Sequence, residues 1–363
     1  MHSRGAEYWI AFSSVDGIGP AKTRRLFEHF GSLRKAWEER AEGLRAAGLD
    51  SAAVQAFLKV RQRLDLANEL TRLDRAGVEA IAWDDQERYP QLLRHIANPP
   101  VVLYLKGELL PRDEVAVAIV GTRTPTEYGR RVAARLAGEL AAKGVTIVSG
   151  LARGVDAEAH RAALEAGGRT VAVLGSGLDV MYPREHAGLA RDIAKSGAVM
   201  SDYPLGSQPD AVHFPARNRI VSGLSLGTIV VEAGDTSGAL ITARFAGEQG
   251  RDVFGVPGSI FSKHSLGVHR LIQDGAKLVA TAQDVLDELN LRLVAHQLHM
   301  PVSPEPEDPL EAALLAALTA EPTHIDDVAR SANLPVAQVS SVLTIMELKG
   351  LVRQVGALSY VPA

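Results

Sequence analysis

The chain has 363 residues, 46% of them hydrophobic, which is enough for two or three domains with packed cores. Its formal net charge of -4 excludes a protein that coats nucleic acid by bulk positive charge, so any polyanion must bind a local patch. The absence of cysteine excludes disulfides, Cys-ligated zinc and thiol catalysis, and no His-x-x-x-His pair points to a metal site.

Residues 1–80 form the first predicted domain, a set of short helices with 13 basic and 11 acidic side chains. Gly-Ile-Gly-Pro followed by a basic helix resembles the helix-hairpin-helix element of SAM-like helical domains. In that element the backbone N–H groups of the glycine turn point at a DNA phosphate. A second interpretation stays open, in which the glycines only make a tight interhelix turn. The candidate DNA contacts are Gly17, Gly19, Lys22, Arg24 and Arg25.

Residues 81–292 form the second predicted domain, where short apolar strands alternate with helices. This pattern is typical of a doubly wound α/β fold, in which helices cover both faces of a mostly parallel, Rossmann-like sheet. Thr124-Pro125-Thr126-Glu127 predicts a capping box that starts a helix directly behind Arg123. The expected strands are 117–120, 145–148, 170–174, 199–201, 228–231, 253–256 and 277–280.

Three of these strands end in loops rich in glycine, hydroxyl groups and arginine. In an open α/β sheet such loops lie side by side at the carboxyl ends of the strands, and glycine lets backbone N–H groups approach an anion. The sequence therefore predicts a phosphate site at this edge. Its candidate residues are Gly121, Thr122, Arg123, Ser149, Gly150, Arg153, Gly154, Gly175, Ser176, Gly177 and Arg184.

Two later segments add donors to the same edge. The stretch from His213 to Arg219 carries Arg217, Asn218 and Arg219, which either join the phosphate groove or brace a loop or a subunit contact. Ser237 and Gly238 begin a helix after a strand, which is a second place where backbone N–H groups favour an anion.

The common nucleotide-binding signatures are missing from these loops. A dinucleotide site needs Gly-x-Gly-x-x-Gly after the first strand and an acidic residue after the second, and a P-loop needs Gly-x-x-x-x-Gly-Lys-Ser/Thr. None of these patterns occurs in the chain. These absences argue against an ordinary Rossmann dehydrogenase and a P-loop ATPase.

Three polar residues in this domain have a catalytic and a structural interpretation. Asp156 and His160 are four residues apart on one predicted helix, so they either form a base and its orienting partner or respectively cap the helix and pack against the loop. Glu232 ends a strand near the expected cleft, where its carboxylate either polarises a sugar or holds the glycine loop through N–H groups. We favour the structural interpretation for all three.

The C-terminal part divides into a linker and a third domain. Residues 293–309 contain four prolines with acidic residues between them, which predicts a linker. Residues 310–363 have the order helix, helix, helix and two-stranded ribbon, which is typical of a winged helix. Its third helix carries few basic or amide side chains, and 3 basic residues stand against 6 acidic ones from 308 onward. We therefore expect weak DNA binding at most, and a surface suited to a protein contact.

Taken together, the motifs of the second domain resemble the DNA-processing protein A (DprA, or Smf) family of bacteria. The likeness covers the whole α/β domain in order and is far more specific than one glycine loop. The matching runs are 118–123, 149–160, 175–183, 213–219, 237–242 and 256–259. The helical and winged-helix modules also resemble arrangements in the family, although they are its variable parts.

The resemblance implies a non-enzymatic protein without a cofactor or metal. Such proteins bind and protect incoming single-stranded DNA during natural transformation, help to load the recombinase RecA, and usually form homodimers through the α/β domain. A basic residue follows the Tyr-Pro pair in the family, and here that position is Arg184. With no apolar run long enough for a membrane span or a signal peptide, we expect a cytoplasmic protein.

The main alternative is an enzyme. The architecture is also similar to that of nucleotide-cleaving phosphoribohydrolases of the lysine-decarboxylase-like group, which carry Pro-Gly-Gly-x-Gly-Thr-x-x-Glu. Here the comparable stretch, residues 225–232, keeps Gly-Thr and the later glutamate but lacks the Pro-Gly-Gly turn. That departure argues against hydrolysis.

Overall fold

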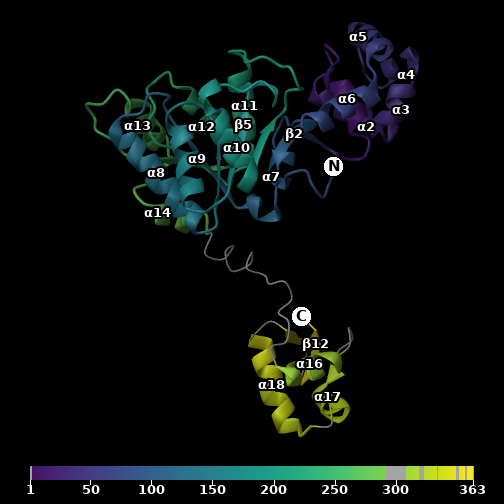
Figure 1. Ribbon diagram of the computed structural model, residues 1–363, viewed down its shortest axis with the longest axis vertical. Helices are drawn as coiled ribbons and strands as arrows, with labels where there is room; N and C mark the ends of the chain where they lie inside the picture. The colour runs from purple at the N-terminus through teal and green to yellow at the C-terminus, as the bar shows by residue number, and fades with distance from the viewer. Residues whose placement is uncertain are drawn as a thin grey trace. The chain divides into compact units, whose positions relative to one another are not determined.

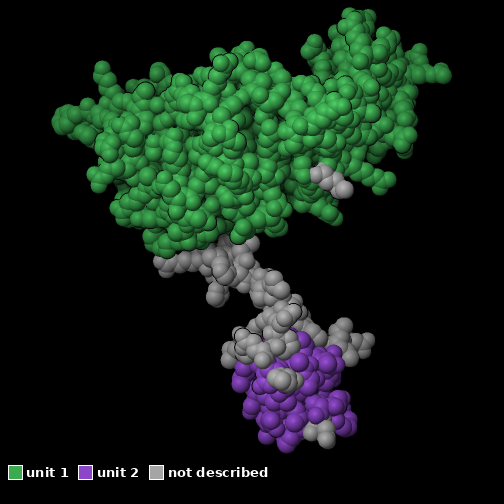
Figure 2. Space-filling model, in the orientation of Figure 1, with its two compact units in different colours: residues 1–291 green, residues 292–363 purple. Residues whose placement is uncertain are grey.

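The computed structural model describes residues 2–290, 308–318, 323–332, 334–348, 351–355 and 358–362. The chain forms two compact units, residues 1–291 and residues 292–363 (Figure 2), and each is described by itself. Of the predicted linker, residues 293–307 lie outside the described residues. Asp308 and Pro309 instead begin the first helix of the second unit, where the Asp308 carboxylate accepts a hydrogen bond from the Leu310 N–H.

A nine-stranded sheet forms the centre of the first unit, in the order β1-β2-β6-β5-β4-β3-β7-β8-β9. From β6 to β9 all neighbours are parallel, which confirms the predicted, mostly parallel α/β fold. The chain runs outward from β3 to β6 and then returns to β7 on the other side of β3. The order of strands therefore switches between β3 and β7. The parallel strands are β3 (Ala116–Val120), β4 (Thr146–Ser149), β5 (Thr170–Leu174), β6 (Ala198–Ser201), β7 (Gly227–Val230), β8 (Asp252–Gly255) and β9 (Lys277–Leu278).

Helices cover both faces of the sheet (Figure 1), as the doubly wound prediction requires. One face packs against α8 (Glu127–Ala142), α9 (Val155–Glu165) and α10 (Ala187–Ser196), with α14 (Ala282–Glu288) beside α8. The other face shares a hydrophobic core with α7 (Gln91–Arg94), α11 (His213–Gly223), α12 (Gly238–Glu248) and α13 (Leu266–Gln273). The chain also makes two short 3-10 turns, Pro111–Glu114 and Arg184–His186.

Two strands were missed by the sequence patterns. β1 (Glu79–Ala82) and β2 (Val102–Gly107) are antiparallel to each other, and β2 is antiparallel to β6. Both are nearly continuous apolar runs without the polar alternation that marks an antiparallel strand, because helices bury them as well. The outer edge of β1 is also paired, since the Ser3 N–H donates to the Ala80 carbonyl at 2.9 Å and the Ala82 N–H donates to the Ser3 hydroxyl at 3.1 Å.

The predicted capping box differs in detail from the structure. Helix α8 is capped by Thr126 rather than Thr124, and the Thr126 hydroxyl accepts a hydrogen bond from the Gly129 N–H at 3.2 Å. Thr124 instead lies in the loop, where its N–H donates to the Thr122 hydroxyl at 3.3 Å. The prediction places Pro125 at the first position of the helix, so the helix starts two residues later than predicted.

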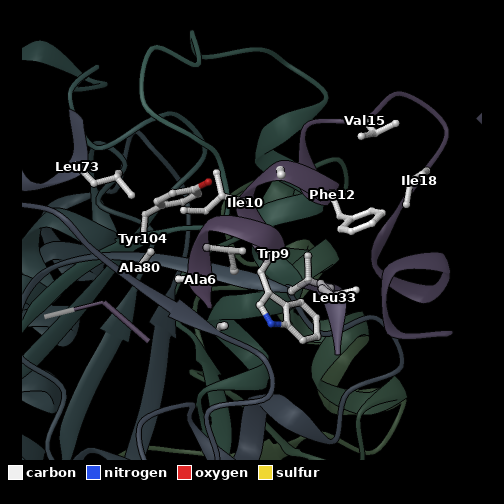
Figure 3. Close-up of a cluster of buried hydrophobic side chains, with 14 of the residues drawn as sticks. Ala6, Trp9, Ile10, Phe12, Val15, Ile18, Leu33, Leu73, Ala80 and Tyr104 are labelled. Atoms are coloured by element: carbon white, nitrogen blue, oxygen red, sulfur yellow. The ribbon is translucent and has the colours of Figure 1, made fainter. Parts of the chain in front are cut away.

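Six helices precede the sheet, and the first and the last of them pack directly against its strands. Figure 1 shows α2–α6 gathered beside β2. The aromatic side chain of Trp9 and the side chain of Leu73 lie in one buried cluster with Ala80 and Tyr104 of the sheet (Figure 3). The helical part therefore shares a core with the sheet. The helices are α1 (Ala6–Ser13), α2 (Pro20–Phe30), α3 (Leu33–Glu38), α4 (Ala41–Ala46), α5 (Ser51–Arg63) and α6 (Leu66–Arg75).

The second unit has the predicted winged-helix order. Its core is a separate cluster that includes Leu314, Val328, Leu343 and Tyr360. A short extra strand, β10, joins the expected ribbon and makes a three-stranded sheet in the order β10-β12-β11. Its elements are α16 (Pro309–Ala316), β10 (Thr323–His324), α17 (Ile325–Ala332), α18 (Val336–Leu348), β11 (Val352–Gln354) and β12 (Ser359–Pro362). Among the described helices of both units, none has the length and apolarity needed to cross a bilayer.

Candidate nucleic-acid site

A groove of about 970 Å³ opens at the carboxyl ends of β3, β4 and β7, where the order of the strands switches. Open α/β sheets bind their ligands at this position because the loops diverge on either side of the switch and leave a crevice. We call this pocket the switch-point groove. The sequence-predicted residues that line it are Gly121, Thr122, Arg123, Gly150, Arg217, Asn218, Ser237 and Gly238.

The buried carboxylate of Glu232 fixes the loop that follows β3. One of its oxygens accepts a hydrogen bond from the Thr126 N–H at 2.9 Å, and the other accepts one from the Thr126 hydroxyl at 2.6 Å. Its backbone carbonyl accepts from the Thr122 N–H at 2.7 Å. Because its carboxylate is hydrogen-bonded to Thr126 at the start of α8, Glu232 is a structural residue that fixes the position of this loop. It holds the loop of the neighbouring strand and not its own glycine loop.

The loop after β4 is held by buried charges on its two sides. One carboxylate oxygen of Asp156 accepts hydrogen bonds from the Gly150 N–H at 3.1 Å and the Ala152 N–H at 3.3 Å. The Arg217 guanidinium donates to the Gly150 carbonyl at 2.6 Å and also to the Val173 carbonyl. Any side chain at position 150 would collide with that guanidinium, which explains the glycine.

This bonding differs from the expectation that the Ser149–Gly150 loop offers its groups to a phosphate. The Gly150 N–H is directed at Asp156, and the Ser149 hydroxyl donates to the Ile119 carbonyl at 2.6 Å inside the sheet. Both groups are satisfied within the protein. They shape the floor of the groove.

Burial changes the pKa values beneath the groove. Loss of water raises the pKa of Asp156, and it lowers the pKa of Arg217, because burial disfavours the charged form of each. Attraction between the two groups opposes both shifts. Arg123, at the surface of the groove, lowers the Arg217 pKa further by repulsion.

His160 is fully buried and does not face Asp156 as a catalytic partner would. The Thr170 hydroxyl donates to the Ile147 carbonyl at 2.7 Å, so its oxygen accepts from His160 Nδ1 at 2.6 Å. Burial lowers the pKa of His160 to about 3, with further lowering by His186 and Arg217. Helix α9 has Gly154 at its N-cap position, so Asp156 is not the cap that the sequence suggested. Asp156 and His160 are both structural here.

The positive charge of the groove is exposed. Arg123 lies at the surface, and within the part of the chain that the structure describes no carboxylate pairs with it. Its guanidinium stands over the Phe214 ring at 5.5 Å, and that ring is 5.4 Å from the ring of Tyr182. A cation beside two adjacent aromatic rings is a favourable surface for a nucleobase and its phosphate.

Sequence reasoning missed the basic residues on the opposite side of the groove. Lys263 is exposed and lines the groove together with His264, in the segment after β8. The Ala233 N–H donates to the His264 carbonyl at 2.7 Å, which ties this segment to the end of β7. The only local signal was the preceding Val256-Pro257-Gly258-Ser259 run, which contains no charge.

The other predicted residues lie beside the groove, beneath it or away from it. Arg153 and Gly175 line a small adjoining hollow, and Arg153 is paired with the Glu185 carboxylate at 2.5 Å. Arg219 forms a partly buried ion pair with Asp202 at 2.9 Å and does not line the groove. Ser176 is buried, and its hydroxyl donates to the Val180 carbonyl at 2.7 Å.

Three further positions from the prediction have local explanations. Gly154 has φ +79°, and a side chain there would collide with the Thr122 carbonyl, so the first two loops interlock at this point. Gly177 is packed against the Pro204 carbonyl. Arg184 is exposed in the 3-10 turn after the Tyr182–Pro183 pair, outside the groove lining.

The Gly17–Gly19 turn of the helical part uses its charges internally. Gly17 has φ +80°, and Gly19 is the N-cap residue of α2. The Lys22 ammonium donates to the Gly17 carbonyl at 2.9 Å and to the Asp50 carboxylate at 2.8 Å. Arg24 stands over the Trp83 ring at 5.5 Å, and Arg25 is exposed. The glycines make a tight interhelix turn and Arg25 is left at the surface, so DNA contact by this turn stays a prediction.

Comparison with known proteins places this fold and groove in a defined family. Residues 80–290 match the model of the DNA recombination-mediator protein A family, and residues 299–357 match the DprA winged helix domain. The chain belongs to the DNA recombination-mediator protein A family. The resemblance found in the motifs is therefore confirmed.

Individual relatives extend over most of the chain. Protein Smf of Escherichia coli is 41% identical over 96% of this chain and 94% of its own length, and Protein Smf of Synechocystis is 36% identical over 97% and 98%. The X-ray structure of DNA processing protein A from Streptococcus pneumoniae has a TM-score of 0.70 at 38% identity and covers 79% of this chain and 99% of its own. DNA processing protein A from Helicobacter pylori, described with a unique single-stranded DNA binding mode, has a TM-score of 0.52 at 32% identity over 59% of this chain and 98% of its own.

Proposed function

We propose that this protein binds single-stranded DNA without sequence preference in the switch-point groove and acts in DNA processing during recombination. The observation that carries this proposal is the exposed Arg123 beside the Tyr182–Phe214 ring pair, with Lys263 on the opposite side. Among the described residues, Asp156 is the one carboxylate in the groove lining, and it already accepts hydrogen bonds from two backbone N–H groups. The field at the surface of the groove is therefore positive.

The aromatic pair favours a single strand over a duplex. Stacking on a side-chain ring needs a base that is free of its own neighbours, and every base has a π-face, so the contact ignores sequence. Phosphates contribute attraction that weakens with salt. A relative from Helicobacter pylori that is described by its single-stranded DNA binding mode supports the same assignment.

We propose that the protein acts as a binder and not as an enzyme. His160 is sealed in the core against Thr170, and Asp156 and Glu232 are engaged with backbone or hydroxyl donors. The loop at 225–232 also lacks the Pro-Gly-Gly turn of the phosphoribohydrolases. These residues supply neither a free general base nor the phosphate loop of that enzyme group.

The partners follow from the family resemblance. We propose that the protein passes DNA to RecA, in natural transformation where the organism supports it, that it forms a homodimer through the α/β part, and that it works in the cytoplasm. The edge strand β9 supports the homodimer, since Leu278 is 48% exposed there. The acidic winged helix suits a protein contact, because Gln338, Ser341 and Thr344 are exposed on α18 and offer no positive charge.

We also propose three domains at residues 1–80, 81–292 and 308–363, with a linker at 293–307, because Asp308 and Pro309 begin helix α16. The helical part has its own stacked aromatic centre, with the rings of Phe12 and Phe57 5.1 Å apart and Trp37 edge-on to both. Limited proteolysis tests these boundaries. Cleavage is expected within 293–307 and is not expected near residue 80, where the helices share a core with the sheet.

The function is tested by fluorescence anisotropy with labelled oligothymidine, duplex DNA as the comparison, and a salt series. Wild type should prefer the single strand, and Arg123→Ala should bind more weakly with a shallower salt dependence. Arg135→Ala is the matched control, because Arg135 is exposed on α8 and pairs only with Glu139 among the described residues. Equal binding by Arg123→Ala and wild type would show that the DNA site lies elsewhere.

A further inference from the structure

The segment between β8 and α13 displays two large apolar side chains to solvent. Ile260 is 74% exposed and Phe261 is 92% exposed, which makes Phe261 the most exposed large hydrophobic side chain of the described residues. Two residues later the same segment contributes Lys263 and His264 to the switch-point groove. The apolar tip therefore stands beside the groove.

Hydrogen bonds hold this segment in one shape. The Ser262 N–H donates to the Ser259 carbonyl at 3.0 Å, and the Phe261 N–H donates to the Ser259 hydroxyl at 3.3 Å. At its base, His269 Nε2 lies 3.1 Å from the Gly258 carbonyl, and the Tyr128 hydroxyl donates to the Pro257 carbonyl at 2.6 Å. A braced turn that ends in an exposed ring presents that ring at low entropic cost on binding.

Phe261 and the Tyr182–Phe214 pair follow different strands. Tyr182 follows β5, and Phe214 begins α11, whereas Phe261 follows β8. The ends of β5, β4, β3, β7 and β8 are successive neighbours, so β5 and β8 are separated by four strand spacings. At about 4.8 Å for each spacing, the strand ends are roughly 19 Å apart, a length of about five or six stacked nucleotides.

We propose that Phe261 is a second base-stacking platform, at the end of the groove opposite the Tyr182–Phe214 pair. A single strand lying along the groove stacks one base on Tyr182–Phe214, passes its phosphates by Arg123 and Lys263, and stacks another base on Phe261. This inference rests on the proposed function and adds the path and minimum length of the bound strand. Oligonucleotides too short to reach Phe261 bind at the first platform alone.

The occupant follows from the neighbours of the ring. The residues of its segment that line the groove are Lys263 and His264, and the groove lining contains no unsatisfied carboxylate among the described residues. An exposed ring next to a cation fits a polymer that alternates flat bases with phosphates. A second copy of this chain is the competing occupant, and the experiment separates the two.

The test compares Phe261→Ala with wild type on oligothymidines of 4 and 12 nucleotides, measured by anisotropy at fixed salt. We expect about tenfold weaker binding of the 12-mer, as the loss of one stacked base gives, and unchanged binding of the 4-mer. Phe261→Trp should restore affinity, and its indole emission should be quenched by DNA. Ile260→Ala is the matched control, because Ile260 is an exposed apolar neighbour without a π-face.

A 12-mer with abasic sites in place of bases gives an independent reading. It should bind Phe261→Ala and wild type equally, because it offers phosphates but nothing to stack. Equal binding of the normal 12-mer to Phe261→Ala and wild type overturns the proposal. A smaller oligomer of Phe261→Ala in sedimentation, with unchanged DNA affinity, also overturns it and assigns the ring to a second copy.

These outcomes remain distinct from failure of the proposed function. If wild type does not bind the 12-mer, both proposals fall. If Arg123→Ala abolishes binding and Phe261→Ala leaves it unchanged, the groove stands and only the second platform is overturned. Phe261 is at the tip of a surface turn, so its variants should keep the circular dichroism and melting temperature of wild type.

Discussion

The switch-point groove and the Gly17–Gly19 turn have similar sequence patterns, but their basic side chains differ in whether an acidic partner binds them. Each joins glycines to nearby basic residues, and each sequence predicts a phosphate contact. In the groove, Arg123 remains exposed and without a carboxylate partner among the described residues. In the turn, Lys22 is bonded to the Gly17 carbonyl and to Asp50. Whether a cation can serve a ligand therefore depends on acidic residues that are distant in sequence.

The largest effect is expected from Arg217, which supports the groove from below. Its replacement tests the stability of the groove, whereas replacement of the exposed cations tests DNA binding. Arg217→Ala leaves the Gly150 and Val173 carbonyls without their buried donor, and it leaves Asp156 without a nearby positive charge. We expect the free energy of unfolding to fall by about 3 to 5 kcal/mol, as when one member of a buried charged network is removed. Urea denaturation measures this loss. Wild-type stability in Arg217→Ala would contradict the structural role assigned to the residue.

The double variant Arg123→Ala/Lys263→Ala should change binding without changing stability. Both side chains are exposed, so the free energy of unfolding should stay within about 0.5 kcal/mol of wild type. The affinity for oligothymidine should fall by more than about tenfold, and the salt slope should become shallower by about two. Arg135→Ala should match wild type in the same anisotropy series. An unchanged salt slope in the double variant would show that neither residue contacts a phosphate.

The free energy of unfolding should depend on pH because of His160, which is buried beneath the groove. The pKa of His160 is about 3 in the folded protein against 6.5 as its ordinary value. Between these values the unfolded chain binds more protons, so the contribution of neutral His160 to stability is lost as pH falls from 6.5 towards 3. His160→Asn, which can keep the bond to Thr170, should give a flatter dependence of unfolding free energy on pH. Equal pH dependence in both proteins would show that His160 is not the group responsible.

The smallest effect is expected in the helical turn. Lys22→Ala removes a cation that is already paired with Asp50, so the affinity for oligothymidine should change less than about twofold. Arg25→Ala is the informative companion, because Arg25 is exposed on the same helix. A tenfold loss in Lys22→Ala would end the contrast between the two regions and make the turn a DNA site. The measurement is the same anisotropy titration.

The fold was largely predictable because strands that are buried on both faces have a recognisable apolar composition. The strands from Ala116 to Gly255 are short Val, Ile and Ala runs, since both faces of the sheet are covered. Glycine loops marked where these strands end. The antiparallel strands β1 and β2 have the same apolar appearance and lack the polar alternation that marks an antiparallel strand, and for that reason they escaped prediction.

The site was predictable in place and only partly in its residues. Loop position is local information, which is why the groove lies where the glycines indicated. The partners of charged side chains depend on contacts between residues that are separated in sequence. Asp202 forms an ion pair with Arg219, and the Asp156 carboxylate accepts a hydrogen bond from the Gly150 N–H. Lys263 was missed for the converse reason, because nothing near it in sequence shows that its segment returns to the end of β7.

The unequal ends of the central sheet limit how copies of this protein can assemble. At one end, the chain's own second and third residues occupy the hydrogen-bonding groups of β1, and helices stand over that strand. At the other end, β9 has no neighbouring strand among the described residues. A molecule with one open side can meet a like side on a second copy, after which no pairing edge is left. In the proposed homodimer, pairing through β9 would therefore leave no edge for a third copy.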